Sequence, residues 1–435
     1  MDEMNQLKNK KALIFGEDTR SFLTVVRSLS KAGMLVDVVC FSNTSVALQS
    51  NCINKIYQLN HQSMTIDEWK NEVSQIIIDK EYDIVIPCDE RALFPLIDIK
   101  DNIQTNSIFA LPERNILVPL FDKVETRNTA QLCNISVAKG KQLNISNTSF
   151  AQLSQEFGLP LVLKPTQSYS EEELNKRQSV KIADNEQLFL EFQKENLNQK
   201  CLVEGYFTGY GVGVSVLSNR GDVKAAFAHA RVSEPETGGG SSYRKAIPIE
   251  PSMLYACQKF CMHLKYTGVA MFEFKYNPNS KDWILIEINA RFWGSLPLAV
   301  FAGVDFPAMY AHVLLEKFIP DCLTYNQAAY ARNFTADIYD MVGEYDSLKN
   351  KKSSLQAITQ LSKRVLSFSR LLTTNESLDS FSWSDQKPFW GELYSLFKDK
   401  LYKLPVIKEQ RQKKRINQFQ QKLRTMRKQP DNILF

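Results

Sequence analysis

The sequence predicts a mixed protein in which an α/β region precedes an α+β region and a helical C-terminal extension. Residues 11–110 alternate short apolar runs with helical stretches, which indicates a parallel sheet. Residues 112–320 give a β-rich order that ends in a strong hairpin, and the sequence beyond about residue 330 is mostly helical and polar. We therefore expect three regions, at residues 1–110, 111–325 and 326–435. With 435 residues, 44% of them hydrophobic, the chain is long enough for several packed domains.

The first region reads as a βαβαβ unit. Apolar runs near residues 12–15, 36–41 and 83–87 are typical of buried strands, and residues 66–80 have a helical pattern. Ligands bind beyond the carboxyl ends of strands in such sheets, so residues 16–20 and 88–91 lie at the edge where a ligand is expected. No GxGxxG sequence is present, which disfavours a dinucleotide site. These polar residues either cap helices or contact a substrate.

The most informative segment is the predicted hairpin at residues 268–294. Two β-rich runs flank the turn sequence NPNSKD, so we expect them to pair antiparallel. If the turn is centred on Ser280, Glu273 lies directly across from Glu287. Because side chains alternate along a strand, one face is predicted to be polar and the other hydrophobic. The polar face holds Glu273, Lys275, Glu287, Asn289 and Arg291, and the hydrophobic face holds Phe272, Phe274, Ile284, Ile286 and Ile288.

Two carboxylates opposed on paired strands repel each other unless a positive charge lies between them. A divalent cation is the simplest solution, because Glu273, Glu287 and the Asn289 amide form an oxygen-only ligand set suited to Mg²⁺ or Mn²⁺. Arg291 is then placed to bind phosphate or carboxylate through its guanidinium. The alternative is a solvated face on which Lys275 and Arg291 form salt bridges.

Two lysines are candidates for holding phosphates, since the sequence contains no GxxxxGK[ST] loop. Lys123 comes near the start of a predicted helix, and Lys164 ends the apolar run LPLVLK just before Pro165. A lysine at a strand end directs a compact positive charge to the sheet edge. Either lysine is otherwise an ordinary surface charge.

The net charge of +5 is concentrated in the C-terminal tail. Residues 408–428 hold nine Lys and Arg and one acidic residue, which leaves a charge of −3 for the rest of the chain. This distribution disfavours a specific nucleic-acid partner and confines any polyanion or membrane argument to the tail. The tail also carries a narrow apolar seam that fits an anionic membrane surface, a partner helix or the body of the protein itself: Ile416, Phe419, Leu423 and Met426.

The cysteines and the N-terminal sequence predict a cytoplasmic protein. Eight cysteines are scattered along the chain, and the opening MDEMNQLKNKK is too polar for a signal peptide. The longest uncharged apolar stretch, residues 292–304, is shorter than the roughly 20 residues that span a bilayer. Cys257 and Cys261, with His263 nearby, form either part of a metal site or a buried helix face.

Seven residues occur in a recognisable order: Lys123 in LFDKVETR, Lys164 in LPLVLKP, Glu204 in CLVEGYFTG, Glu273 in GVAMFEFK, and Glu287, Asn289 and Arg291 in LIEINARFWG. This ordered set resembles the ATP-grasp superfamily, and within it the carboxylate-amine ligases and the carbamoyl-phosphate synthetase large chain. The resemblance covers about residues 11–320. It implies a Rossmann-like, pre-ATP-grasp domain followed by an ATP-grasp fold, in which two α+β lobes clamp ATP.

The resemblance implies that several residues bind the nucleotide. Lys123 and Lys164 would contact the ATP phosphates. Glu204 would begin the hinge segment, where main-chain groups around Tyr206 and Phe207 hold the adenine.

The resemblance also implies a metal site and a catalytic pair. Glu273, Glu287 and Asn289 would hold the magnesium ions that bridge the phosphates. Arg291, with Lys164, would steady the transferred phosphoryl group and the acyl phosphate.

The implied reaction is ATP-dependent and ADP-forming. A small carboxylate, for which an amino acid is one candidate, becomes an acyl phosphate, and an amine then displaces phosphate. Arg231 and Arg244 flank a glycine-rich segment where they are candidates for clamping the carboxylate, although a flexible surface loop explains the same composition. A second hypothesis is a regulatory or degenerate nucleotide-binding module without ligase turnover. The expected partners are small-molecule substrates, and a homo-oligomer is compatible with the sequence.

Overall fold

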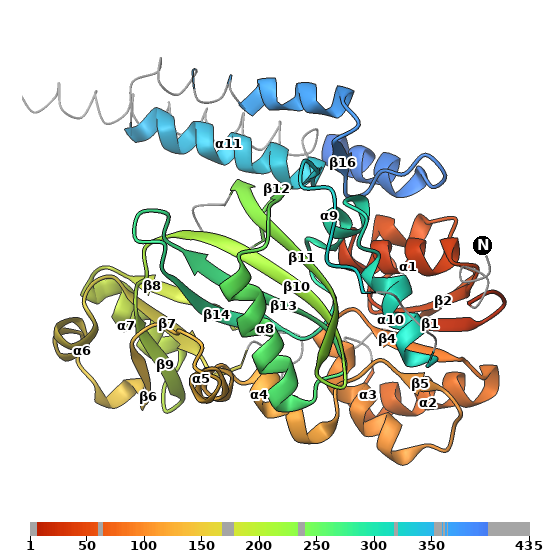
Figure 1. Cartoon of the computed structure of the whole chain (residues 1–435), viewed down its shortest axis with the longest axis horizontal. Coiled ribbons are helices and arrows are strands. Elements are labelled where there is room, and N and C mark those ends of the chain that lie inside the picture. The colour runs from red at the N-terminus through yellow and green to blue at the C-terminus, as the bar shows by residue number, and fades with distance from the viewer. Residues whose placement is uncertain are drawn as a thin grey trace, which may run out of the picture.

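The computed structural model describes residues 7–59, 64–167, 178–233, 240–316, 321–351 and 364–398, with residues 359 and 362. Three β-sheets, with helices around and between them, make up the fold (Figure 1). Within these residues, no helix has both the length and the apolar composition needed to cross a membrane. The predicted basic tail and its apolar seam lie outside the described residues.

The N-terminal sheet is parallel throughout, with strand order β3-β2-β1-β4-β5. Helix α1 covers one face and helices α2 and α3 cover the other, which explains why the inner strands are continuous apolar runs. The α/β prediction for this region is confirmed. The elements are β1 (Lys11–Phe15), α1 (Ser21–Lys31), β2 (Leu35–Cys40), β3 (Lys55–Gln58), α2 (Ile66–Lys80), β4 (Ile84–Pro87), α3 (Glu90–Asn102) and β5 (Ile108–Phe109).

A four-stranded antiparallel sheet, with order β6-β9-β7-β8, forms what we call the small lobe. Helices α6 and α7 pack on one face of this sheet through Leu153, Phe189 and Phe192. The opposite face carries Lys164 and Glu204 together with Val162 and Leu202. The elements of the lobe and of the helices before it are α4 (Leu117–Phe121), α5 (Lys123–Leu132), β6 (Gly140–Asn144), α6 (Phe150–Phe157), β7 (Leu161–Pro165), β8 (Lys181–Ala183), α7 (Glu186–Glu195) and β9 (Lys200–Gly205).

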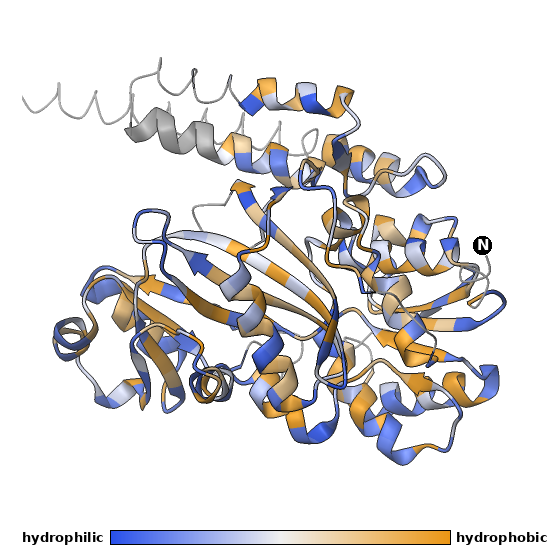
Figure 2. Ribbon diagram, viewed as in Figure 1, coloured by the Kyte–Doolittle hydropathy of each residue, from blue (hydrophilic) through white to orange (hydrophobic). Residues whose placement is uncertain are grey.

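The large lobe is a seven-stranded sheet with order β14-β13-β10-β11-β12-β15-β16. Helix α8 covers one face, where Met253, Cys257 and Phe260 pack against alternate residues of β10 and β13. Hydrophobic residues accordingly concentrate on the strands and on the inward side of α8 (Figure 2). The elements are β10 (Tyr210–Asn219), β11 (Asp222–Ser233), β12 (Tyr243–Ala246), α8 (Pro251–Leu264), β13 (Gly268–Tyr276) and β14 (Trp283–Asn289).

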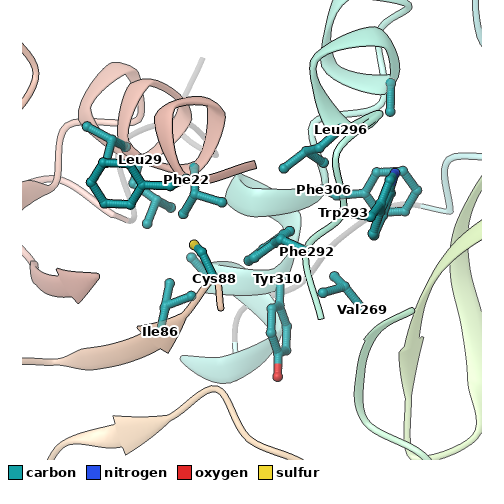
Figure 3. Packing of buried hydrophobic residues seen from close by; sticks show 14 of the residues in the cluster. Phe22, Leu29, Ile86, Cys88, Val269, Phe292, Trp293, Leu296, Phe306 and Tyr310 are labelled. Atoms are coloured by element: carbon teal, nitrogen blue, oxygen red, sulfur yellow. The ribbon is translucent and has the colours of Figure 1, made fainter. Parts of the chain in front are cut away.

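One hydrophobic core joins the N-terminal sheet to the large lobe. Phe22 of α1 and Ile86 of β4 belong to the same buried cluster as Phe292 and Tyr310, which come from the chain after β14 (Figure 3). This cluster also contains side chains from the face of the large sheet that α8 leaves uncovered. The N-terminal sheet is therefore held firmly beside that face. The helices that complete the junction are α9 (Leu296–Phe301) and α10 (Phe306–Leu314).

The C-terminal region crosses one end of the large lobe and reaches α1 (Figure 1). It is not purely helical, because two of its strands extend the large sheet. Arg27 of α1 forms an ion pair of 2.9 Å with the buried Asp385, which fixes this region to the N-terminal sheet. The elements are β15 (Tyr330–Arg332), α11 (Phe334–Lys351), β16 (Glu376–Leu378) and a helix at residues 387–398; short 3₁₀ helices lie at Val46–Gln49, Arg114–Ile116, Ile145–Asn147 and Phe368–Leu372.

Candidate active site

The hairpin of β13 and β14 places its two glutamates directly opposite each other. Glu273 pairs with Glu287, and Met271 pairs with Asn289, as a turn centred on Ser280 predicts. Both glutamates are half-buried and lie on the face opposite α8. The predicted register of the two carboxylates is confirmed.

A β-bulge beside Glu287 changes the predicted hydrophobic face. The register shifts after Glu273, so Phe274 pairs with Leu285 rather than with Ile286. An extra residue reverses the alternation of side chains beyond the bulge. Leu285 therefore joins Phe274 in the core under α8, and the prediction that Ile284 and Ile286 belong to the hydrophobic face is wrong.

Glu273 forms an ion pair with Arg231, which lies on β11, two strands away in the same sheet. Arg231 Nη2 lies 3.0 Å from both Oε1 and Oε2 of Glu273. The two side chains are about one quarter exposed, at 23% and 24%. Opposed carboxylates need a positive charge beside them, and at Glu273 the guanidinium of Arg231 supplies it.

Arg291 follows β14 and is held by the N-terminal sheet. Its Nε donates to Glu90 Oε1 at 2.8 Å, and its Nη2 donates to Asn289 Oδ1 at 3.3 Å. Burial disfavours the charged guanidinium, but Glu90 and Asp89 outweigh this effect and raise the pKa of Arg291. Glu90 begins α3, with two residues between it and the end of β4, so the carboxyl edge of the parallel sheet contributes to the site, as the sequence predicts.

Lys164 and Glu204 meet on the face of the small lobe opposite α6 and α7. Lys164 Nζ lies 2.6 Å from Glu204 Oε2, and Arg127 Nη1 lies 2.9 Å from Glu204 Oε1. Lys164 is only 4% exposed and Glu204 5%. The interpretation of Lys164 as an ordinary surface charge is therefore wrong.

A cavity lies between the small lobe and the hairpin. Lys123 begins α5, and its N–H donates to the carbonyl oxygen of Thr166 at 2.8 Å, which ties α5 to the end of β7. Charged and polar residues from both sides line the cavity: Lys123, Arg127, Glu204, Glu287 and Asn289. Of the residues that the sequence singles out, the cavity brings together Lys123, Glu204, Glu287 and Asn289; Lys164, Glu273 and Arg291 are not among its lining residues.

The segment after β9 connects the two lobes. Tyr206 is 39% exposed, and Phe207 is half-buried. Lys275 Nζ donates to the Tyr206 hydroxyl at 3.1 Å and lies 4.3 Å from the centre of its ring. Lys275 therefore binds the connecting segment rather than a carboxylate of the hairpin.

A buried histidine lies in the same row of the large sheet as the two glutamates. His229 of β11 pairs with Gly213 of β10, which pairs with Glu273. A Cβ at Gly213 would lie 2.1 Å from His229 Cε1, so the imidazole occupies the space that a side chain at residue 213 would fill. His229 Nδ1 has no hydrogen-bond partner among the described residues.

Arg244 has a different position from the one that the sequence suggests. It pairs with Arg231 across β11 and β12, but its guanidinium is buried and contacts Asp379 at 2.5 Å. Its Nη1 also donates to the Gly294 carbonyl at 2.7 Å. Arg244 is thus a structural link to the C-terminal region, and the prediction that it clamps a substrate is not supported.

Two acidic residues at the edge of the parallel sheet have capping roles. Asp18 accepts the N–H groups of Ser21 and Phe22, and Asp89 accepts the N–H of Arg91. Because these carboxylates occupy the helix N-termini, the capping alternative holds for both residues.

The cysteines of α8 are likewise structural: Cys257 and Cys261 are buried against the sheet, and no cluster of three or more His, Cys, Asp or Glu suited to a metal occurs in the described segments.

Sequence reasoning did not single out Arg127, Glu90 and His229 for the site. Arg127 follows Lys123 by four residues on one helix, a spacing that places both on one face. Glu90 lies within residues 88–91, the sheet edge where the sequence predicts a ligand, but it contacts Arg291 only through the packing of distant segments. For His229 the sequence carries no local signal.

The residues at the hairpin suit a magnesium-nucleotide complex. Glu273, Glu287 and Asn289 offer hard oxygen ligands within two adjacent strands. Lys123 and Arg127 supply positive charge on the opposite side of the cavity, and Lys164 contacts Glu204, which also lines it. This donor set would suit a hard divalent cation, which would neutralise negative charge on a phosphate.

Comparisons with known proteins give one family match and several matches in fold. Residues 198–335 match the family model described as ATP-grasp in the biosynthetic pathway with Ter operon. No curated protein sequence matches the chain.

Several solved structures share the fold. The biotin carboxylase domain of 2-oxoglutarate carboxylase from Hydrogenobacter thermophilus has 14% identity and a TM-score of 0.57, covering 74% of this chain and 73% of that one. N5-carboxyaminoimidazole synthetase from Staphylococcus aureus, complexed with ADP, has 15% identity and a TM-score of 0.55, covering 72% and 79%. L-amino acid ligase from Bacillus licheniformis has 16% identity and a TM-score of 0.54, covering 71% and 74%. The chain thus shares the fold of these structures, and residues 198–335 match an ATP-grasp family model.

Proposed function

We propose that this protein is an ATP-dependent ligase that activates a small carboxylate as an acyl phosphate and joins it to an amine. The observation that carries the proposal is the cavity between the small lobe and the hairpin, which is lined by cations on one side and by Glu287 and Asn289 on the other. The solved structures that share the fold include complexes with ADP and with its magnesium salt. ATP with Mg²⁺ is accordingly the proposed cosubstrate pair.

In the proposed first step, a carboxylate oxygen of the substrate attacks the γ-phosphorus of ATP. The bond from this phosphorus to the β,γ-bridging oxygen breaks, and ADP leaves. Lys123 and Lys164 neutralise phosphate charge, and Arg291 lies beside the transferred group. When bound by Glu273, Glu287 and Asn289, Mg²⁺ would neutralise the phosphate oxygens.

In the second step, the amine nitrogen attacks the acyl carbon and phosphate leaves with the C–O bond electrons. The amine loses a proton, and the products are an amide and inorganic phosphate. Arg231, at the large-sheet side of the site, is the candidate for contacting the substrate carboxylate. An amino acid is one candidate for the acid, because its carboxylate needs only a small anion site.

A hydroxamate assay tests the proposal. The full chain is incubated with Mg-ATP, hydroxylamine and, one at a time, acetate, bicarbonate and the common L-amino acids, while hydroxamate and ADP are measured. Hydroxylamine replaces the amine, so any activated acid is trapped. We expect at least one acid to give hydroxamate and ADP in equal amounts, and Glu287→Gln to abolish both.

The matched control is Glu186→Gln, which removes an exposed carboxylate of the small lobe far from the cavity. It should leave the yields unchanged. If no acid gives hydroxamate or ADP, and Glu287→Gln leaves residual ATP hydrolysis unchanged, the ligase proposal is wrong. Binding of Mg-ADP without acid-dependent turnover would instead support the nucleotide-binding module.

A further inference from the structure

The contact between Arg231 and Glu273 occupies the position that a bidentate metal would take. Arg231 Nη2 is equidistant, at 3.0 Å, from the two carboxylate oxygens. A donor at equal distance from both oxygens lies in the mouth of the carboxylate. A divalent cation that uses both oxygens of Glu273 needs the same space.

The sheet is built so that Arg231 can reach this position. Strand β10 lies between β11, which carries Arg231, and β13, which carries Glu273. On β10, Gly213 pairs with Glu273 and Gly211 pairs with Lys275. The His229 imidazole fills the space over Gly213, and Gly211, which lies between Arg231 and Lys275 in the sheet, presents no side chain on the path of the arginine.

The two opposed carboxylates differ in their charge partners. Glu273 has the ion pair with Arg231, whereas Glu287 accepts a hydrogen bond from Asn289 Nδ2 at 3.2 Å. No ion pair to Glu287 within 4.0 Å occurs among the residues that the structure covers. The repulsion between the pair is therefore relieved at Glu273, on the side of β11.

We propose that Arg231 is the resident cation of Glu273 in the nucleotide-free protein, and that a divalent metal must displace it before Glu273 becomes a metal ligand. This inference rests on the metal-binding role of Glu273 in the proposed function. The displaced guanidinium, released beside the metal, is then free to bind the carboxylate of the acid substrate. Metal binding and substrate binding are coupled through one side chain.

If a divalent metal must displace Arg231 from Glu273, the affinity of the nucleotide-free protein for the metal depends on Arg231. Free Mn²⁺ competes with a charge-assisted contact that is part-buried, so the wild-type chain should bind Mn²⁺ weakly. Removing Arg231 removes the competitor. We expect Arg231→Gln to tighten Mn²⁺ binding by about tenfold or more, and Arg231→Lys, which keeps a cation, to tighten it less.

The experiment titrates the full chain with Mn²⁺. Electron paramagnetic resonance measures the concentration of free Mn²⁺ at each point of the titration. The control is Lys275→Gln, which removes the same charge from the same face of the sheet but from a side chain that contacts Tyr206. It should change the affinity for Mn²⁺ by less than about twofold. Circular dichroism confirms that each variant is folded.

Each outcome separates this inference from the proposed function. Glu273→Gln should weaken Mn²⁺ binding in both the wild-type and the Arg231→Gln chain; if it has no effect, the metal-binding role of Glu273 is wrong. If Glu273→Gln weakens binding but Arg231→Gln does not tighten it, the exchange is wrong and the metal site stands. Equal tightening by Lys275→Gln would mean a general charge effect, which also overturns the exchange.

Discussion

Lys164 Nζ lies 2.6 Å from Glu204 Oε2, and both residues are buried on the inner face of the small lobe. A candidate phosphate-binding lysine is thus held in place by a carboxylate rather than extended into solvent. Arg127 contacts the other oxygen of the same carboxylate. The three charges position one another, so a nucleotide would meet a preformed cationic surface.

Replacing Lys164 by Met should lower both stability and nucleotide affinity. Glu204 would remain buried with Arg127 as its partner, so we expect a loss of about 2 kcal/mol in the free energy of unfolding. Urea denaturation measures the loss, and calorimetric titration with Mg-ADP measures the affinity. The control is Lys141→Met, because the Lys141–Glu156 pair of the same lobe is about half-exposed. That change should cost at most about 0.5 kcal/mol, and equal costs for the two variants would contradict the prediction.

Breaking the Arg244–Asp379 pair should loosen the C-terminal region. Both side chains are almost completely buried, and the contact is 2.5 Å, so Asp379→Asn leaves a buried guanidinium without its charge partner. We expect a loss of about 3 kcal/mol of stability and faster proteolysis beyond residue 376. Limited proteolysis with mass spectrometry locates the cuts. Unchanged cleavage rates there would show that the pair does not fasten the region.

Gly213→Ala should destabilise the protein by displacing His229. The new Cβ would lie 2.1 Å from the imidazole Cε1, and overpacking of this kind costs about 1–3 kcal/mol. The double variant Gly213→Ala/His229→Ala should recover most of the loss. Gly343→Ala is the matched control, because nothing lies within 4 Å of its Cβ position in α11, and thermal unfolding should show no loss. A melting temperature for Gly213→Ala equal to that of the wild type would refute the steric argument.

The stability of the protein should depend on pH through His229. Burial, together with the charges of Arg231 and Arg244, lowers the pKa of His229 from 6.5 to about 3. Below the unfolded pKa the unfolded chain therefore binds a proton that the folded chain does not. Stability is unaffected at higher pH and falls as the pH drops from 6.5 toward 3, by up to about 1.4 kcal/mol per pH unit.

His229→Asn removes this titration. Its free energy of unfolding should fall less between pH 7 and pH 5 than that of the wild type, as measured by urea denaturation at each pH. Parallel pH profiles of the two proteins would mean that His229 is not buried in the neutral form.

Much of the fold and of the hairpin follows from local patterns in the sequence. The turn sequence NPNSKD fixes the register near Ser280, because a turn and the alternation of side chains determine which residues face each other. Helical spacing and apolar runs likewise predict the parallel sheet. The bulge beside Glu287 was not predicted, because an extra residue in one strand leaves no trace in hydrophobic alternation when its neighbours are also apolar.

The order of elements, the opposed glutamates and the candidate lysines follow from residue type and spacing along single segments of the sequence. The partners of the charged side chains follow from the tertiary structure. Arg231 on Glu273, Arg244 on Asp379 and Glu90 on Arg291 join residues more than 40 positions apart. Such contacts depend on how sheets and helices pack, and a charge written in a sequence does not reveal whether it faces a ligand or another side chain.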